Sequence, residues 1–210
     1  ASLIGLKQDF ISSARLDNLL SCFLACKALV TCKNTHASLL VCNDHEEVGS
    51  ASSSGAQGPF LKSVLERLGH CCGDEPGLLS RIVAKSSLIS IDNAHGVHPN
   101  YLERHDDKHR PVLNSGPVIK LNANQRYASN SHSVALFKSI CGTVKVPHQS
   151  FVMRNDMACG STIGPITSAE TGINTIDVGV PTFAMHSVRE LAGSKDAYNL
   201  YKVITSFYSR

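Results

Sequence analysis

Short, continuous apolar runs that alternate with helical segments constrain the fold of this chain most. Five runs of four to six residues occur, at 37–42, 86–91, 118–121, 150–153 and 173–178. A run of this length without polar alternation is typical of a strand buried on both faces of a sheet. Helical patterns fall around and between the runs, at 17–31, 59–68, 131–140, 160–171 and 197–208. This alternation predicts an α/β fold, with the sheet sandwiched by helices.

Composition excludes several classes of protein. The chain has 210 residues, 42% of them hydrophobic and 18% charged, which is enough for one sizeable core and too apolar for a disordered chain. No stretch approaches the roughly 18 apolar residues that a membrane-spanning helix needs. The net charge is only +3 and no basic run occurs, so we expect neither a membrane nor a nucleic acid as partner.

The eight cysteines form no C-x-x-C pair, which disfavours a zinc ribbon. Several stand in apolar surroundings, where a thiol behaves as a small hydrophobic side chain. We therefore expect reduced, buried cysteines and a cytoplasmic protein.

Acidic and imidazole side chains follow the apolar runs. Glu46 and Glu47 come after the first run, Asp92 after the second, Asp156 after the fourth and His186 after the fifth. In open α/β sheets, ligands bind outside the carboxyl ends of the strands. Carboxylates gathered there repel each other unless cations neutralise them. The pattern favours a pair of divalent metal ions.

Each of these acids also has a simpler interpretation. Asp17 stands where a loop becomes a helix, so it is either an N-cap or a carboxylate that bridges two metals. Glu46 and Glu47 form either a solvated turn or a pair with separate roles, in which one binds metal and the other accepts a proton from water. Asp156 follows Arg154, which could neutralise it, and we leave it out of the metal site.

The histidines are interpreted by their surroundings. His186 lies among apolar residues, so its imidazole needs either a hydrogen-bond partner or a metal. Asp92 follows an apolar strand and belongs at the rim of the sheet. We assign His95 to the substrate and His98 to the structure.

Together these strings resemble the M18 family of metallo-aminopeptidases, the aspartyl aminopeptidases, and most of all their bacterial members. The matching motifs are spread over nearly the whole chain. They are 13–18, 45–50, 92–101, 116–120, 124–128, 154–156 with 159–160, and 184–190.

The resemblance implies a co-catalytic pair of zinc ions. Asp17 would bridge the two ions, Glu46 would be the general base and acid, and Glu47, Asp92 and His186 would be terminal ligands. Manganese or cobalt could replace zinc in such an oxygen-rich site. The implied reaction removes one N-terminal residue at a time from a peptide.

The family places substrate contacts at the positions of His95, Lys120 and Tyr127. Lys120 would face an acidic side chain of the first substrate residue, which implies a preference for Asp or Glu. Tyr127 would orient the scissile carbonyl through its hydroxyl.

The chain also departs from the family pattern. Another zinc-binding His with a companion Asp, and a dimerisation domain inserted ahead of the Asp17 motif, have no counterpart here. Residues 1–210 therefore look like the carboxyl-terminal part of the catalytic domain, and the intact protein is expected to form a homo-oligomer, a dodecamer by resemblance. Two alternatives stay open: a metal-poor, non-catalytic relative that serves as an assembly or interaction module, and a co-catalytic zinc hydrolase of another specificity.

Overall fold

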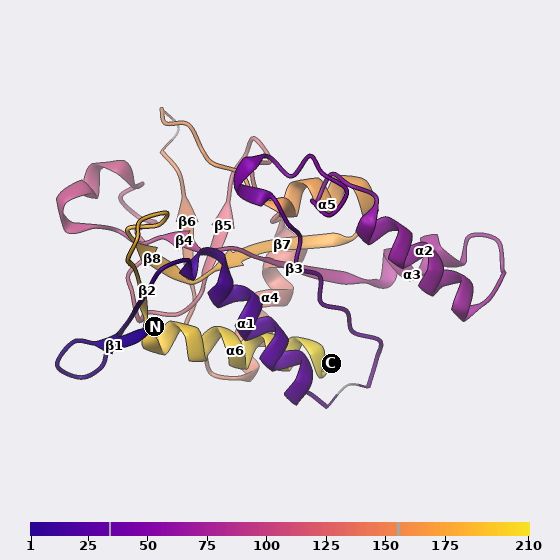
Figure 1. Ribbon diagram of the computed structural model, residues 1–210, viewed down its shortest axis with the longest axis horizontal. Helices are drawn as coiled ribbons and strands as arrows, with labels where there is room; N and C mark the ends of the chain where they lie inside the picture. Colours follow the sequence, from indigo (N-terminus) through magenta and orange to yellow (C-terminus); the bar gives the residue numbers. More distant parts are fainter. Residues whose placement is uncertain (34, 155) are drawn as a thin grey trace.

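The computed structural model describes residues 1–33, 35–154 and 156–210, so Asn155 of the 154–156 motif lies outside the described part. Its main sheet has four strands in the order β3-β7-β5-β6 (Figure 1). They are β3 (Ser87–Ile91), β7 (Asn174–Gly179), β5 (Val118–Leu121) and β6 (Gln149–Val152). These are four of the five predicted strands, and the α/β class is confirmed.

Strand direction divides this sheet into two halves. β3 runs parallel to β7 and β5 parallel to β6, but β5 is antiparallel to β7. The carboxyl ends of β3 and β6 therefore lie at opposite edges, and Asp156, which follows β6, does not join Asp92. Asp156 instead pairs with Arg154, with Nε to Oδ1 at 2.9 Å. The interpretation that Arg154 neutralises Asp156, which leaves Asp156 out of the metal site, is confirmed.

A second sheet of five short strands, in the order β1-β2-β9-β8-β4, was not predicted. The strands are β1 (Ser2–Ile4), β2 (Phe10–Ser13), β9 (Glu190–Gly193), β8 (Pro181–Phe183) and β4 (Ala94–His95). Each has two to four residues, so none carries a long apolar pattern.

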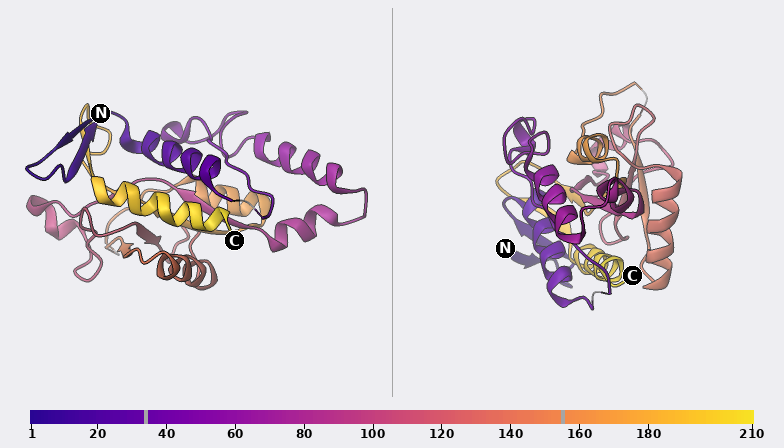
Figure 2. Two further views of the ribbon diagram at one scale, coloured as in Figure 1. Left: turned by 90° about the horizontal axis from the view of Figure 1, so that it is seen from below. Right: turned by 90° about the vertical axis from the view of Figure 1, so that its right-hand side faces the viewer.

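Helices cover both faces of the main sheet. α1 (Leu16–Thr31), α6 (Ser194–Tyr208) and α4 (Ser131–Thr143) lie along one face, with α6 between the other two (Figure 2). Side chains from these three helices pack with Ile176 and Val178 of β7 in the main core. α5 (Ile163–Thr171) lies on the opposite face, where Asp177 of β7 approaches Gly164. Alternate residues of β7 thus point to opposite faces, as the pleat of a strand requires.

The remaining helical segments lie toward the edges. α2 (Phe60–Cys72) and α3 (Leu78–Lys85) form a helical pair that projects from one end of the molecule (Figure 1). Two short 3-10 helices, η1 (Glu46–Val48) and η2 (Pro99–Arg104), belong to the loops around the site. Among the described residues, no helix is both long and apolar enough to span a membrane.

Two sequence-based expectations were wrong. The run 37–42 forms no strand, because no strand of the described residues pairs with it, although Leu40 still packs against the main core. None of the eight cysteines forms a disulfide in the described part of the chain, but Cys26, Cys42, Cys71 and Cys72 are exposed rather than buried. They lie on outward faces of α1 and α2 or on the unpaired 37–42 segment.

Candidate metal centre

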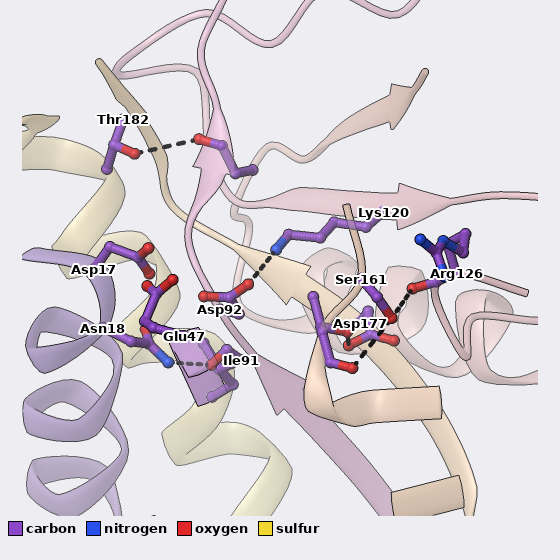
Figure 3. A network of polar contacts seen from close by, with 12 residues as sticks. Asp17, Asn18, Glu47, Ile91, Asp92, Lys120, Arg126, Ser161, Asp177 and Thr182 are labelled. Atoms are coloured by element: carbon purple, nitrogen blue, oxygen red, sulfur yellow. Dashed lines mark hydrogen bonds and ion pairs between the residues drawn. The ribbon is translucent and has the colours of Figure 1, made fainter. Parts of the chain in front are cut away.

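Three of the predicted metal ligands converge. Asp17 comes from the start of α1, Glu47 from η1, and His186 from the loop between β8 and β9. His186 Nε2 lies 3.1 Å from Asp17 Oδ2 and 3.0 Å from Glu47 Oε1, and the three ligand atoms lie within 4.8 Å of one another. Figure 3 shows the carboxylates of Asp17 and Glu47 pointing toward each other. Carboxylate oxygens combined with an imidazole nitrogen are a donor set that zinc accepts.

The fourth predicted ligand, Asp92, lies beside this group and is paired with a cation. It follows β3, and its Oδ2 lies 3.0 Å from Lys120 Nζ, as Figure 3 shows. The Lys120 side chain is only 4% exposed. Burial opposes ionisation of Asp92, but the nearby Lys120 ammonium holds the pKa of this carboxyl below its usual range. Asn18 connects the two regions, because its Nδ2 donates to the Ile91 carbonyl at 2.8 Å.

Asp17 has the opposite electrostatics. Burial, followed by the charges of Asp92 and Glu47, raises its pKa to about 9. Its Oδ1 is buried and accepts no hydrogen bond from the described residues. A buried carboxylate oxygen without a partner, beside two further carboxylates, carries a strong penalty unless a cation is bound. The residues present therefore fit a divalent metal ion.

Asp17 is also held in an unusual backbone conformation. It is not the N-cap of α1, because that position belongs to Arg15, which has a φ of 55°. Asp17 and Asn18 have non-helical torsions within the first turn, and the peptide bond that joins them is cis. The N-cap interpretation of Asp17 was therefore wrong.

Glu46 begins η1 next to the metal-ligand group. Its side chain is half-buried, and burial together with the charges of Asp92 and Glu47 raises its pKa above the ordinary value. A carboxylate with a raised pKa accepts a proton more readily near neutral pH. The turn is closed by Gly49 at a φ of 100°, a conformation that favours glycine.

The predicted substrate-binding residues surround Lys120. Tyr127 is buried, and its ring centroid lies 5.6 Å from Lys120 Nζ and 6.3 Å from the Phe151 ring. His95 lies on β4 with its side chain in part exposed, and partial burial and the Lys120 charge lower its pKa. In this structure, the Lys120 ammonium is directed at Asp92.

Two buried carboxylates were missed from the sequence. Glu190, 1% exposed, accepts the backbone N–H of Asp17 on Oε2 at 2.8 Å and that of His186 on Oε1 at 2.7 Å. The available signal was its place at the end of the 184–190 motif. Asp177 is an acid within an apolar run, a pattern that itself marks a buried polar network.

Asp177 joins three elements behind Tyr127. It accepts the Ala128 backbone N–H at 2.6 Å and the Thr162 hydroxyl at 2.7 Å. Gly164 of α5 approaches so closely that a Cβ at this position would lie 2.2 Å from the carboxylate. Figure 3 shows Asp177 beside Ser161 and Arg126, whose carbonyl accepts from the Ser161 hydroxyl at 3.2 Å. The segment 126–128 is therefore held by a buried carboxylate on the same face of the sheet as Lys120.

The fold and the site define an α/β protein with an acidic, histidine-containing candidate metal centre between its two sheets. The sequence model of the family described as aminopeptidase I zinc metalloprotease (M18) matches residues 1–208. The chain belongs to this M18 family.

Curated relatives agree with this assignment. A protein of Ectopseudomonas mendocina (strain ymp) named "Probable M18 family aminopeptidase 2" is 57% identical over 209 residues, and a protein of Azotobacter vinelandii with the same name is 58% identical over 209 residues. The alignments cover 100% of this chain but 48% of each relative. The chain thus spans about half the length of the curated relatives it matches.

Solved structures give the same fold. A chain of the cryo-EM structure of the Ape4 and Nbr1 complex superimposes with a TM-score of 0.93 at 44% identity, covering 100% of this chain and 41% of that one. The S. cerevisiae mApe1 dodecamer superimposes with a TM-score of 0.85 at 32% identity, covering 99% and 47%. A Thermotoga maritima M18 aminopeptidase, at 24% identity and a TM-score of 0.89 with 99% and 48% covered, supports the fold alone.

Proposed function

We propose that this chain carries most of the active site of a zinc aminopeptidase that removes acidic N-terminal residues from peptides. The observation that supports this most is the convergence of Asp17, Glu47 and His186 beside Asp92, from four separate segments of the chain. Membership of a zinc metalloprotease family gives the class of reaction. The peptide specificity and the number of ions go beyond that membership and belong to the proposal.

Two zinc ions fit the donor set better than one. Asp17 offers Oδ2 toward His186, while its Oδ1 is buried with no partner among the described residues. Asp17, Glu47, His186 and Asp92 would together hold the ions, and a carboxylate with both oxygens available could serve more than one of them. Zinc bound here would make water a stronger nucleophile and polarise the scissile carbonyl. Manganese or cobalt would be accepted by the same oxygen-rich set.

The protein's own residues perform the proton transfers and the positioning. Glu46, whose pKa is raised, takes the proton from the attacking water and delivers it to the leaving amine. The Lys120 ammonium lies beside the ligand group and would meet the acidic side chain of the first substrate residue. Tyr127 and His95 complete the substrate-binding side, where the Tyr127 hydroxyl would orient the carbonyl.

The chain is proposed to supply only part of a catalytic domain, with further ligands and an inserted dimerisation domain provided by sequence outside residues 1–210. Its match to about half of each curated relative supports this. The related S. cerevisiae mApe1 is a dodecamer, which supports a homo-oligomer here. A cytoplasmic location is part of the proposal, and eight cysteines without a disulfide in the described residues support it.

The test uses the full-length protein, its Glu46→Gln variant, and peptides that begin with Asp, Glu or Leu. We expect Asp and Glu peptides to be cleaved in preference to Leu peptides, and Glu46→Gln to lower kcat by at least about 100-fold, since general acid–base catalysis contributes that much or more. Zinc content, measured by elemental analysis, should stay at two ions per chain in both proteins.

Three outcomes would contradict the proposal in different ways. Activity that survives Glu46→Gln would remove Glu46 from the role of base. A preference for Leu would favour a co-catalytic zinc hydrolase of another specificity. A wild-type protein without zinc or activity would favour a non-catalytic assembly module.

A further inference from the structure

Glu190 lies in the second sheet, between the segment that leads to Asp17 and the loop that contains His186. It is the first residue of β9 and pairs with Ser13, the last residue of β2. The chain continues from Ser13 to Asp17, and it reaches Glu190 directly after the loop that contains His186. One buried carboxylate therefore lies under both segments, which are 169 residues apart in the sequence.

Both oxygens of this carboxylate are used by backbone donors. Oε2 accepts the N–H of Asp17 and Oε1 accepts the N–H of His186, at 2.8 and 2.7 Å. Hydrogen bonds to a charged acceptor are stronger than those between neutral groups. Because Glu190 is 1% exposed, water does not compete for these bonds. The carboxylate thus holds the backbone of both ligands, and each of its two oxygens is engaged by one backbone donor.

The backbone that Glu190 holds is strained. His186 has a φ of 68° and Ala184 a φ of 54°, both in the left-handed region. This region costs a residue other than glycine roughly 1–2 kcal/mol. The His186 side chain is 61% exposed, so packing contributes little to its position. Besides the pairs that its imidazole makes with Asp17 and Glu47, the bond from its backbone to Glu190 anchors this residue.

We propose that Glu190 is a positioning residue that sets the spacing of Asp17 and His186 for metal binding by accepting their backbone N–H groups, without contacting the metal itself. This inference rests on the metal site of the proposed function. It predicts that loss of the Glu190 carboxylate raises the zinc Kd, and that a control variant with a similar loss of Tm does not.

The experiment measures the zinc Kd of the full-length protein by competition with a chelating dye, together with the Tm after zinc removal. Glu190→Gln keeps the size of the side chain but turns an amide N–H toward one of the two backbone donors. We expect its Kd for zinc to rise 10- to 100-fold, the range seen when groups that orient metal ligands are removed. Glu190→Asp keeps the charge but is too short to reach both donors, and we expect a Kd between those of the wild type and Glu190→Gln.

Asp196→Asn is the matched control. Asp196 is also fully buried and also accepts two backbone N–H groups, from Asn114 and Gly116, but it lies at the start of α6. We expect Asp196→Asn to lower the Tm about as much as Glu190→Gln while leaving the zinc Kd unchanged.

Each result decides between positioning and a general structural role. Unchanged zinc affinity in both Glu190 variants would overturn the inference, and so would an equal loss of affinity in Asp196→Asn. If neither Glu190 variant folds while Asp196→Asn does, Glu190 is a requirement of the fold and the inference fails. If the wild type itself binds no zinc, the proposed function fails first, which separates the two failures.

Discussion

Asp17 and Asp92 contribute neighbouring carboxylates to one site, yet the start of α1 and the end of β3 hold them in opposite ways. Asp92 is paired with the buried Lys120, and its pKa is lowered. Asp17 has a buried oxygen with no partner among the described residues, and its pKa is raised to about 9. Asp92 is thus electrostatically neutralised by its own lysine, whereas Asp17 needs either a bound proton or a metal ion.

Among the variants considered, Asp92→Asn is expected to change the free energy of unfolding most, when it is measured after zinc removal. The substitution leaves Lys120 as a buried ammonium without its counter-ion, so we expect the free energy of unfolding to fall by about 3 kcal/mol or more. Urea denaturation in the presence of a chelator measures it. The double variant Asp92→Asn/Lys120→Met should recover much of the loss, and a loss below about 1 kcal/mol would show that the pair is not a stabilising unit.

Asp196, a buried carboxyl remote from the site, provides a reference for Asp17 and Asp92, because its contribution to stability depends on pH. Burial raises the pKa of Asp196 to about 6, although two backbone N–H groups oppose that shift. Because the folded state holds this proton more tightly than the unfolded chain, Asp196 stabilises the fold below about pH 4. That contribution is lost as pH rises through about 6, and it amounts to roughly 2–3 kcal/mol.

The measurement is the free energy of unfolding of the wild type and of Asp196→Asn between pH 4 and pH 7. The difference between the two proteins should change over this window and become constant above it. If the difference in the free energy of unfolding is independent of pH, the pKa of Asp196 is not raised in the folded state.

The smallest effect is expected for Asp17→Asn after zinc removal. Near neutral pH, Asp17 must take up a proton on folding because its pKa is raised to about 9. A neutral amide removes this cost, and its oxygen can still accept from His186. We therefore expect the free energy of unfolding to rise by about 1 kcal/mol or to stay unchanged, while zinc affinity is lost. Thermal unfolding with and without zinc measures both. A clear loss of stability without zinc would show that the hydrogen bond between Asp17 and Asp92 outweighs the cost of burying Asp17.

The sequence predicted the main sheet because its strands are apolar runs bounded by turns. It did not predict the second sheet, since β2 and β9 are short, mixed in polarity, and separated by nearly the whole chain. The run 37–42 shows the converse failure, because an apolar pattern does not ensure a neighbouring strand.

The acids and the histidine of the site were predictable from their residue types at the ends of apolar runs and from the family motifs. Glu190 and Asp177 were not predicted, because most of their partners are backbone N–H groups from distant segments. A backbone donor leaves no trace in residue identity. Only the folded chain shows that these two carboxylates hold Asp17, His186 and the segment next to Tyr127.

The close approach of Gly164 to Asp177 links α5 to the predicted substrate-binding residues, which lie on the same face of the sheet. Any residue larger than glycine at position 164 has to push the carboxylate away from Ala128, because a Cβ there would lie 2.2 Å from it. The displacement passes directly to the neighbouring Tyr127. A single added methyl group on α5 is therefore expected to shift the segment next to Tyr127, although position 164 belongs neither to the metal-ligand group nor to the predicted substrate contacts.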